Sequence, residues 1–121
     1  MVYSVGASGM FEAALNLPGL GPAERLHGHT YKVEAEVFGE RLDDRGVLVD
    51  LAELKSALYE CLKGLHFQYL NELPEFTSVP PTAENIARHV WQRLKKNKIF
   101  SEFRLRVKVW ENDFLWATYE E

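Results

Sequence analysis

Apolar and polar residues alternate along several stretches of the chain, and a period of two is typical of β-strands with one buried face. The clearest stretch, residues 31–38, reads Tyr-Lys-Val-Glu-Ala-Glu-Val-Phe. Another places Leu105, Val107 and Val109 on one side of a segment near the C-terminus. With two less regular segments, the pattern predicts four strands, at about residues 2–15, 27–38, 104–110 and 114–119.

Two other stretches have apolar residues three or four positions apart, which predicts amphipathic helices. Asp50 can cap the first helix and Thr82 the second. The buried face of the first would contain Leu51, Leu54, Leu58, Cys61, Leu62 and Leu65, and that of the second Ile86, Ala87, Val90, Trp91 and Leu94. We therefore expect Cys61 to pack in the core, and His89, on the opposite face of its helix, to be exposed to solvent.

The order of the elements is strand, strand, helix, helix, strand, strand, with neither repeats nor low-complexity segments. This order predicts an α+β fold, in which a four-stranded antiparallel sheet carries both helices on one face. A chain of 121 residues is long enough for one domain with a substantial core, so we expect residues 1–121 to form a single domain.

Composition and charge exclude several classes of partner. The formal net charge of −4 provides no broad positive field, so we expect no binding to nucleic acid or to anionic membranes. The chain has no apolar run long enough to span a bilayer and no signal-like leader, which favours the cytoplasm. Its single cysteine excludes an internal disulfide.

A pair of histidines marks the start of the second predicted strand. His27 and His29 are two positions apart, so on a strand their imidazoles point to the same face and can converge on one metal ion. A catalytic zinc site needs three protein ligands and an open position, and the pair alone supplies two. The alternative is that both are hydrogen-bonded structural histidines.

Six short motifs, in this order, resemble those of the 6-pyruvoyl-tetrahydropterin synthase and 6-carboxytetrahydropterin synthase family. They are Phe11-Glu12-Ala13-Ala14, Leu26-His27-Gly28-His29-Thr30-Tyr31, Val49-Asp50-Leu51-Ala52-Glu53-Leu54-Lys55, Tyr69-Leu70-Asn71, Pro81-Thr82-Ala83-Glu84-Asn85-Ile86-Ala87 and Val107-Lys108-Val109-Trp110-Glu111. The resemblance implies the tunnelling fold (ββααββ). In that fold three subunits close their sheets into a barrel, and two trimers commonly stack, so a homo-trimer or homo-hexamer is expected.

The resemblance also implies a site, from which this chain departs. Family members act on 7,8-dihydroneopterin triphosphate with zinc held by three histidines, and a cysteine supported by a histidine and an aspartate moves protons. Leu15 stands in place of the first zinc histidine, Ala23 in place of the cysteine, and His66-Phe67 in place of the Asp-His pair. Zinc binding is therefore expected to be weak or absent.

Two residues are candidates to replace the missing catalytic groups. Glu24, three positions before His27, resembles a branch of the family in which a glutamate takes the role of the cysteine, and a carboxylate can accept a proton. The alternative is a surface glutamate in a loop. His66 is a candidate acid, base or third metal ligand, although its place just after a helix also suits a structural histidine.

The pterin-binding part of the site is better retained. Glu111 matches the glutamate that accepts hydrogen bonds from the amino-pyrimidine edge of the pterin, and Thr82 matches the threonine beside it. Without the resemblance, they would be a strand-end charge and a helix cap. We expect a pterin lyase with an altered site, and the alternative is a catalytically inactive pterin-binding homologue or regulatory subunit. A purely structural oligomer with a vestigial pocket is less consistent with the retention of Glu111 and Thr82.

Overall fold

The computed structural model describes all of residues 1–121, and it contains both predicted helices and all four predicted strands. The helices are α1 (Leu51–Lys63) and α2 (Ala83–Lys95). The long strands are β1 (Tyr3–Leu15), β2 (His27–Gly39), β4 (Arg104–Trp110) and β5 (Trp116–Tyr119). A two-residue strand, β3 (Gln68–Tyr69), and three short 3₁₀ turns, η1 (Gly21–Glu24), η2 (Leu70–Glu72) and η3 (Pro74–Phe76), lie between them.

The strands form one sheet in the order β3-β1-β2-β4-β5. The β1–β2, β2–β4 and β4–β5 pairs are antiparallel, whereas β3 runs parallel to β1 and pairs with Ala13 and Ala14. The α+β class is thus confirmed, and the sheet has one more strand than the four expected. A strand of two residues is too short to produce a periodic signal, so the sequence pattern did not predict β3.

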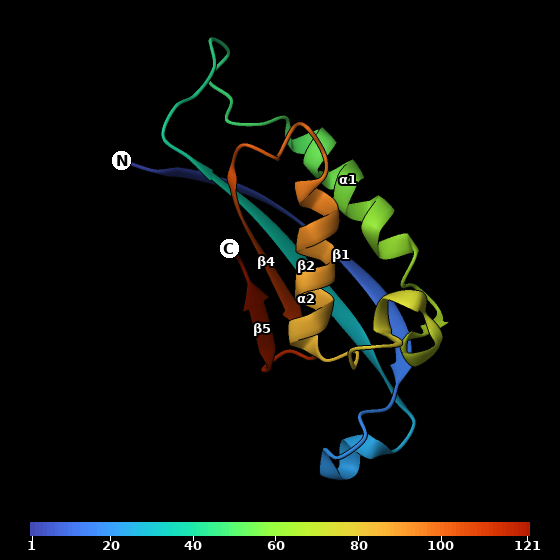
Figure 1. The fold of residues 1–121 in the computed structure, drawn as a ribbon. Helices are drawn as coiled ribbons and strands as arrows, with labels where there is room; N and C mark the ends of the chain where they lie inside the picture. The colour runs from blue at the N-terminus through green and yellow to red at the C-terminus, as the bar shows by residue number, and fades with distance from the viewer.

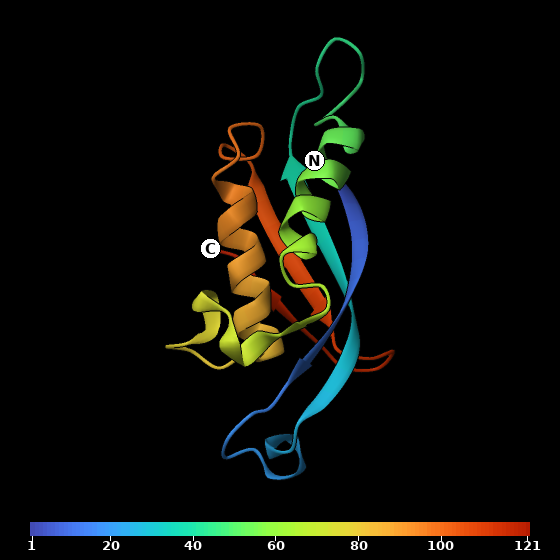
Figure 2. The same cartoon turned by 90° about the vertical axis from the view of Figure 1, so that its right-hand side faces the viewer.

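Both helices cover the same face of the sheet, and the other face carries none (Figure 1; Figure 2). Alternate residues of the strands point toward the helices and are buried, as the period-two pattern predicts. On β2, for example, Tyr31, Val33, Ala35 and Val37 are each no more than 1% exposed. They form the centre of a single apolar core with residues of β1, β4 and the two helices.

Each helix begins where a cap residue was predicted. The Asp50 carboxylate accepts a hydrogen bond from the Ala52 amide at 2.8 Å, and the Thr82 hydroxyl accepts one from the Asn85 amide at 3.2 Å. These bonds satisfy amides of the first turn that have no partner within the helix. Cys61 is buried as expected, and its burial raises the pKa of the thiol, which favours the unreactive protonated form.

The prediction that His89 is exposed to solvent was wrong. Its side chain is 16% exposed, and its Nε2 atom is buried without a hydrogen-bond partner. The turn η3 covers this side of α2: the Phe76 ring lies edge-on to the imidazole at 5.8 Å, and Glu75 Oε2 is 3.9 Å from Nε2. A helical pattern identifies the face that packs on the sheet, but it gives no information about a connector that folds over the opposite face.

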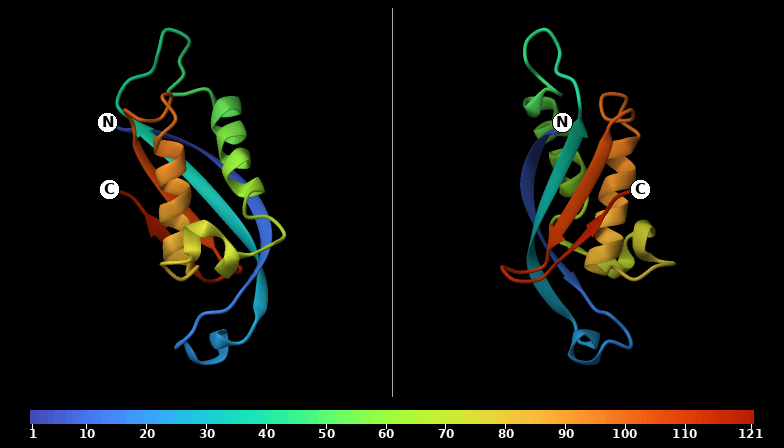
Figure 3. Two further views of the ribbon diagram at one scale, coloured as in Figure 1. Left: turned by 45° about the vertical axis from the view of Figure 1, so that its right-hand side comes forward. Right: turned by 90° about the vertical axis from the view of Figure 1, so that its left-hand side faces the viewer.

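One end of the molecule gathers the segments that carry the candidate site residues. The helix α2 begins there, β4 ends there, and β1 leads there into a loop, residues 16–26, that returns to β2 (Figure 1). This loop projects past the ends of β1 and β2 (Figure 3). No helix is long and apolar enough to cross a membrane.

Candidate functional site

The ladder between β1 and β2 places the two histidines beside Leu15. Leu15 pairs with His27 and Ala13 pairs with His29, so positions 15, 27 and 29 share the face of the sheet that the helices cover. Leu15 is 2% exposed and belongs to the core. Gly28 allows the strands to approach here, because a Cβ atom at this position would lie 3.1 Å from the Ala13 carbonyl oxygen.

His29 lies next to Glu111, which follows β4. The His29 Nε2 atom is 3.7 Å from Glu111 Oε2, and the two side chains are 24% and 33% exposed. The Glu111 amide donates to the Leu115 carbonyl at 3.0 Å, which closes the turn between β4 and β5 and holds the backbone at this position. A carboxylate and an imidazole that were far apart in the sequence therefore face each other at a partly open position.

Aromatic rings surround His29 on its own strand. Its ring meets that of His27 edge-on at 5.1 Å and that of Tyr31 at 5.4 Å, and Tyr31 is stacked on Phe11 at 4.6 Å. Burial lowers the pKa of His29, although the Glu111 carboxylate acts in the opposite direction. Burial raises the pKa of the Tyr31 hydroxyl, and the Glu111 charge adds to this effect. The site thus favours the neutral forms of both side chains.

The two histidines have some features of metal ligands, but the set of donors is incomplete. His27 Nδ1 lies 2.7 Å from the Arg25 carbonyl oxygen, an arrangement that fixes the ring and leaves Nε2 available. However, no group of three or more His, Cys, Asp or Glu side chains is placed to hold a metal ion. Leu15, which has no donor atom, occupies the third position on the shared face. These residues do not fit a catalytic zinc site with three protein ligands.

Glu24 lies in the loop beyond the sheet, at the end of η1. Its Oε1 atom accepts a hydrogen bond from the Gly19 amide at 3.0 Å, and the side chain is exposed. It makes no hydrogen bond or ion pair with His27 or His29. The second carboxylate oxygen has no partner within the chain and is free to accept a proton.

His66 follows α1 and contacts β1, and no hydrogen bond or ion pair joins it to His27 or His29. Its Nδ1 atom accepts a hydrogen bond from the Glu12 amide at 3.1 Å, so this nitrogen carries a lone pair and not a proton. The next residue, Phe67, donates from its amide to the Glu12 carbonyl at 2.7 Å and stacks its ring on the imidazole at 3.8 Å. These contacts give His66 a structural role at the sheet edge.

Thr82 caps α2, and this helix begins at the end of the molecule where β4 ends (Figure 1), one residue before Glu111. Its hydroxyl oxygen accepts the capping bond, and its proton remains available for donation to a ligand. The prediction that Thr82 caps this helix is therefore confirmed.

The sequence indicates no role for Asn16, and for Tyr69 and Asn71 it offers only their place in a family motif. In the structure these three side chains form a hydrogen-bonded group at the end of β1, beside Leu15. The motif Tyr69-Leu70-Asn71 was the available signal for two of them, but its contact with Asn16 joins residues 55 positions apart. Such a contact cannot be read from local periodicity.

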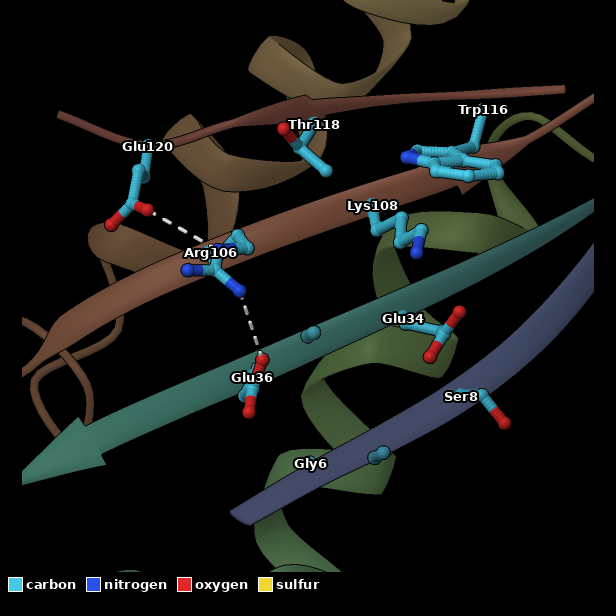
Figure 4. A pocket seen from close by; sticks show the side chains of 11 residues that line it. Gly6, Ser8, Glu34, Glu36, Arg106, Lys108, Trp116, Thr118 and Glu120 are labelled. Atoms are coloured by element: carbon cyan, nitrogen blue, oxygen red, sulfur yellow. Dashed lines mark hydrogen bonds and ion pairs between the residues drawn. The ribbon is translucent and has the colours of Figure 1, made fainter. Parts of the chain in front are cut away.

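A separate hollow lies on the helix-free face of the sheet (Figure 4). Arg106 is at its centre, with Nε 3.2 Å from Glu120 and Nη1 3.5 Å from Glu36 (Figure 4). Lys108 lies over the Trp116 ring at 4.3 Å. The charges of this face are therefore largely paired with one another, and the face lies on the opposite side of the sheet from Leu15 and the two histidines.

Comparison with known proteins relates the whole chain to pterin enzymes. Residues 6–121 match the family model for 6-pyruvoyl tetrahydropterin synthase. A protein of Archaeoglobus fulgidus, provisionally named 6-carboxy-5,6,7,8-tetrahydropterin synthase, is 33% identical over 113 residues, which cover 93% of this chain and 91% of that protein. The dihydroneopterin monophosphate aldolase of Pyrococcus furiosus is 35% identical over 92 residues, or 75% of each chain.

The fold is also similar to that of solved structures. The structure of 6-pyruvoyl tetrahydropterin synthase from Caenorhabditis elegans superimposes with a TM-score of 0.90 at 23% identity, and the match covers 100% of this chain and 96% of that one. At this identity the similarity demonstrates a shared fold.

Proposed function

Because the chain belongs to the 6-pyruvoyl tetrahydropterin synthase family, we propose that it is a pterin lyase. Its substrate is 7,8-dihydroneopterin triphosphate or a related phosphorylated dihydroneopterin. The name of the Pyrococcus furiosus relative, dihydroneopterin monophosphate aldolase, contains a compound of the second kind. The protein acts on the side chain of the pterin and leaves the ring system bound.

The observation that supports this proposal best is the position of Glu111. Its backbone is held by the turn after β4, and its carboxylate is partly open to solvent and lies 3.7 Å from His29. The amino-pyrimidine edge of a pterin presents two parallel N–H donors, which a carboxylate can accept together in charge-assisted hydrogen bonds. Thr82, at the start of α2, would donate a further hydrogen bond to the ring.

The proton acceptor in this proposal is Glu24. Its carboxylate is exposed in the loop next to His27, and one of its oxygens has no partner within the chain. Removal of a proton from the side chain of the substrate needs such a base, while Glu111 holds the ring. His66 takes no part, because its contact with the Glu12 amide holds it at the sheet edge.

Membership of the family implies zinc as a cofactor. In family members the zinc ion polarises the oxygens of the substrate side chain. The donor set of this chain, His27 and His29 facing Leu15, does not fit a three-ligand zinc site. His27 and His29 instead offer hydrogen bonds to the substrate. The reaction is expected to be slower than in a relative with three histidines.

The active form is proposed to be a homo-trimer, or a hexamer of two trimers. The outer edge of β1 has no strand partner from Tyr3 to Glu12, and the outer edge of β5 has none along its length. Such edges favour pairing with another chain, and closure of three sheets into a barrel removes them. The charged, helix-free face of Figure 4 would then line the inside of the barrel.

A second candidate is a pterin-binding homologue or regulatory subunit without catalysis. The replacement of three catalytic groups and one zinc ligand, at Leu15, Ala23, His66 and Phe67, favours it, while Glu111 and Thr82 are retained. This candidate binds pterin as the first does, and the two differ in whether the bound compound is converted.

Turnover and binding measured together test both candidates. The purified protein is incubated with 7,8-dihydroneopterin triphosphate, with added zinc or with a chelator, and the products are separated by chromatography. In parallel, calorimetry measures the affinity for neopterin. Conversion supports the lyase, binding without conversion supports the second candidate, and absence of both would overturn the proposal.

A further inference from the structure

The side chain of Asn71 extends the parallel pairing between β3 and β1 by one more position, where the backbone of β3 has already ended. The pairing of β3 with β1 ends at Ala14 and Tyr69, after which the chain turns into η2. The Asn71 carboxamide then bonds both backbone groups of Asn16: its Oδ1 accepts from the Asn16 amide at 3.0 Å, and its Nδ2 donates to the Asn16 carbonyl at 2.8 Å. A carboxamide has the donor and acceptor of a peptide group, so it can take the place of the missing strand residue.

Tyr69 completes this contact from the strand itself. Its hydroxyl donates to Asn16 Oδ1 at 2.5 Å, so the backbone and the side chain of Asn16 are both held by the segment after α1. All three side chains are partly buried, which makes their hydrogen bonds more costly to break than those on an open surface.

Asn16 is the residue from which the loop with Glu24 leaves the sheet. The next amide, of Leu17, donates to the Ala23 carbonyl at 2.8 Å and closes the loop one residue before Glu24. Glu24 in turn accepts from Gly19. Gly19 has a φ of 87°, a conformation that suits glycine. The loop is thus bonded internally, and its orientation depends on how the chain leaves β1.

From these contacts we infer that Asn71 and Tyr69 are positioning residues for the loop that carries Glu24. They fix the direction of the chain at Asn16, and the bond between Leu17 and Ala23 transmits that direction to the carboxylate. The inference rests on the proposed function in one respect, namely that Glu24 is the proton acceptor. In the proposed function the pterin is held by Thr82, which caps α2, and by Glu111, which follows β4; neither forms a hydrogen bond with Asn16, Tyr69 or Asn71.

The test uses Asn71→Asp, which keeps the size of the side chain but replaces its donor with a second acceptor that faces the Asn16 carbonyl. The matched control is Asn97→Asp, which makes the same change of charge just after the C-terminal end of α2. The Asn97 side chain only accepts a hydrogen bond, from the Ile99 amide at 2.9 Å. Hydrogen exchange of the 121-residue protein is followed by mass spectrometry for peptides that cover residues 16–26 and, as a reference, residues 31–38.

We expect Asn71→Asp to speed exchange in residues 16–26 by about tenfold, with no change in residues 31–38 and no effect of the control. Unchanged exchange in residues 16–26 would overturn the inference. If Asn71→Asp speeds exchange in both peptides, the milder variant Tyr69→Phe decides, because it removes only one hydroxyl. Exchange about threefold faster and confined to residues 16–26 supports the inference, and unchanged exchange in those residues overturns it. This measurement needs no pterin, so its result stands apart from the proposed function.

Kinetics then show whether the loop acts through Glu24. Asn71→Asp should lower kcat by about tenfold and leave KM within about twofold, because Glu111 and Thr82 hold the ring independently of the loop. The double variant Glu24→Gln with Asn71→Asp should be no slower than Glu24→Gln alone. Additive losses in kcat would show that Asn71 does not act through Glu24. An inactive parent would instead contradict the lyase proposal and leave the exchange result to decide the positioning role.

Discussion

Leu15 faces His27 directly across the ladder between β1 and β2. The side chain of Leu15 is 2% exposed, on the same face of the sheet as His27 and His29. A donor at position 15 would therefore converge with the two imidazoles, whereas leucine seals the position with apolar surface. This one pair of residues explains why the retained His-Gly-His segment has an incomplete set of metal donors.

The first prediction is that Leu15→His restores zinc binding. The parent protein, purified without added zinc, should carry less than one zinc per chain, and the variant should approach one, because three imidazoles would share one face. Zinc is measured by mass spectrometry of the metal after equilibration and desalting. The loss of buried apolar surface should lower the free energy of unfolding by about 1–3 kcal/mol.

Ala14→His is the matched control for this experiment. Ala14 is adjacent to Leu15 but points to the opposite face of the sheet, so the added imidazole cannot meet His27. Equal zinc content in the two variants would show that binding comes from an extra surface histidine. Tight stoichiometric zinc in the parent would show that another ligand completes the site.

The second prediction concerns Glu24. Glu24→Gln retains an oxygen that can accept the hydrogen bond from Gly19, so the loop should keep its conformation, but the proton-accepting charge is lost. Turnover should fall by about 10²–10⁴-fold, while the affinity for neopterin changes little. Steady-state kinetics and calorimetry measure the two effects. Full activity in the variant would remove Glu24 from the mechanism.

The sequence predicted the regular elements well, because their signals are local. Asp50 and Thr82 cap the two helices as expected, and the four long strands follow the period-two pattern. What it missed depends on contacts between distant segments. The pairing of His29 with Glu111 requires β2 and β4 to be neighbours in the sheet, and the contact of Asn71 with Asn16 requires the parallel strand β3.

The candidate site was predictable to a similar extent. The family motifs indicated His27, His29, Thr82 and Glu111, and the fold brings them to one end of the molecule. His66 was a candidate for chemistry because of its residue type and because it stands in place of the family's Asp-His pair. Its hydrogen bond to the Glu12 amide, which gives it a structural role, arises from the turn after α1 and has no sequence signature. Zinc binding, the oligomeric state and the cytoplasmic location remain predictions.

A third prediction follows from the burial of His89, which lowers its pKa below the ordinary value, with Glu75 acting in the opposite direction and Arg93 and Lys96 adding to the lowering. In the unfolded chain His89 binds a proton near pH 6.5, and in the folded protein it does so at lower pH. The unfolded state therefore binds more protons as the pH falls below about 6.5, and the free energy of unfolding should decrease through that window and level off below the folded pKa.

His89→Gln should remove this part of the pH dependence. Glutamine keeps a polar side chain without a titratable group, so the difference in the free energy of unfolding between parent and variant should change between pH 7.5 and pH 5. Urea unfolding at a series of pH values measures it. Parallel curves for the two proteins would show that His89 titrates alike in the folded and unfolded states. Burial lowers the pKa of His29 as well, so some pH dependence should remain in the variant.

The last prediction is that Glu111→Ala weakens pterin binding. A carboxylate that receives the two donors of the amino-pyrimidine edge makes charge-assisted hydrogen bonds worth about 1.5–3 kcal/mol each. The affinity for neopterin should therefore fall by at least about tenfold. The fold should be unaffected, because the Glu111 backbone keeps its bond to Leu115 and the neighbouring Val109 carries the packing.

Asp113→Ala, an exposed change in the same turn, is the control for loss of charge. Calorimetry on the three proteins gives the answer: equal affinities for the parent and Glu111→Ala would mean that the pterin lies elsewhere, and an equal loss in both variants would mean that the turn contributes only its charge.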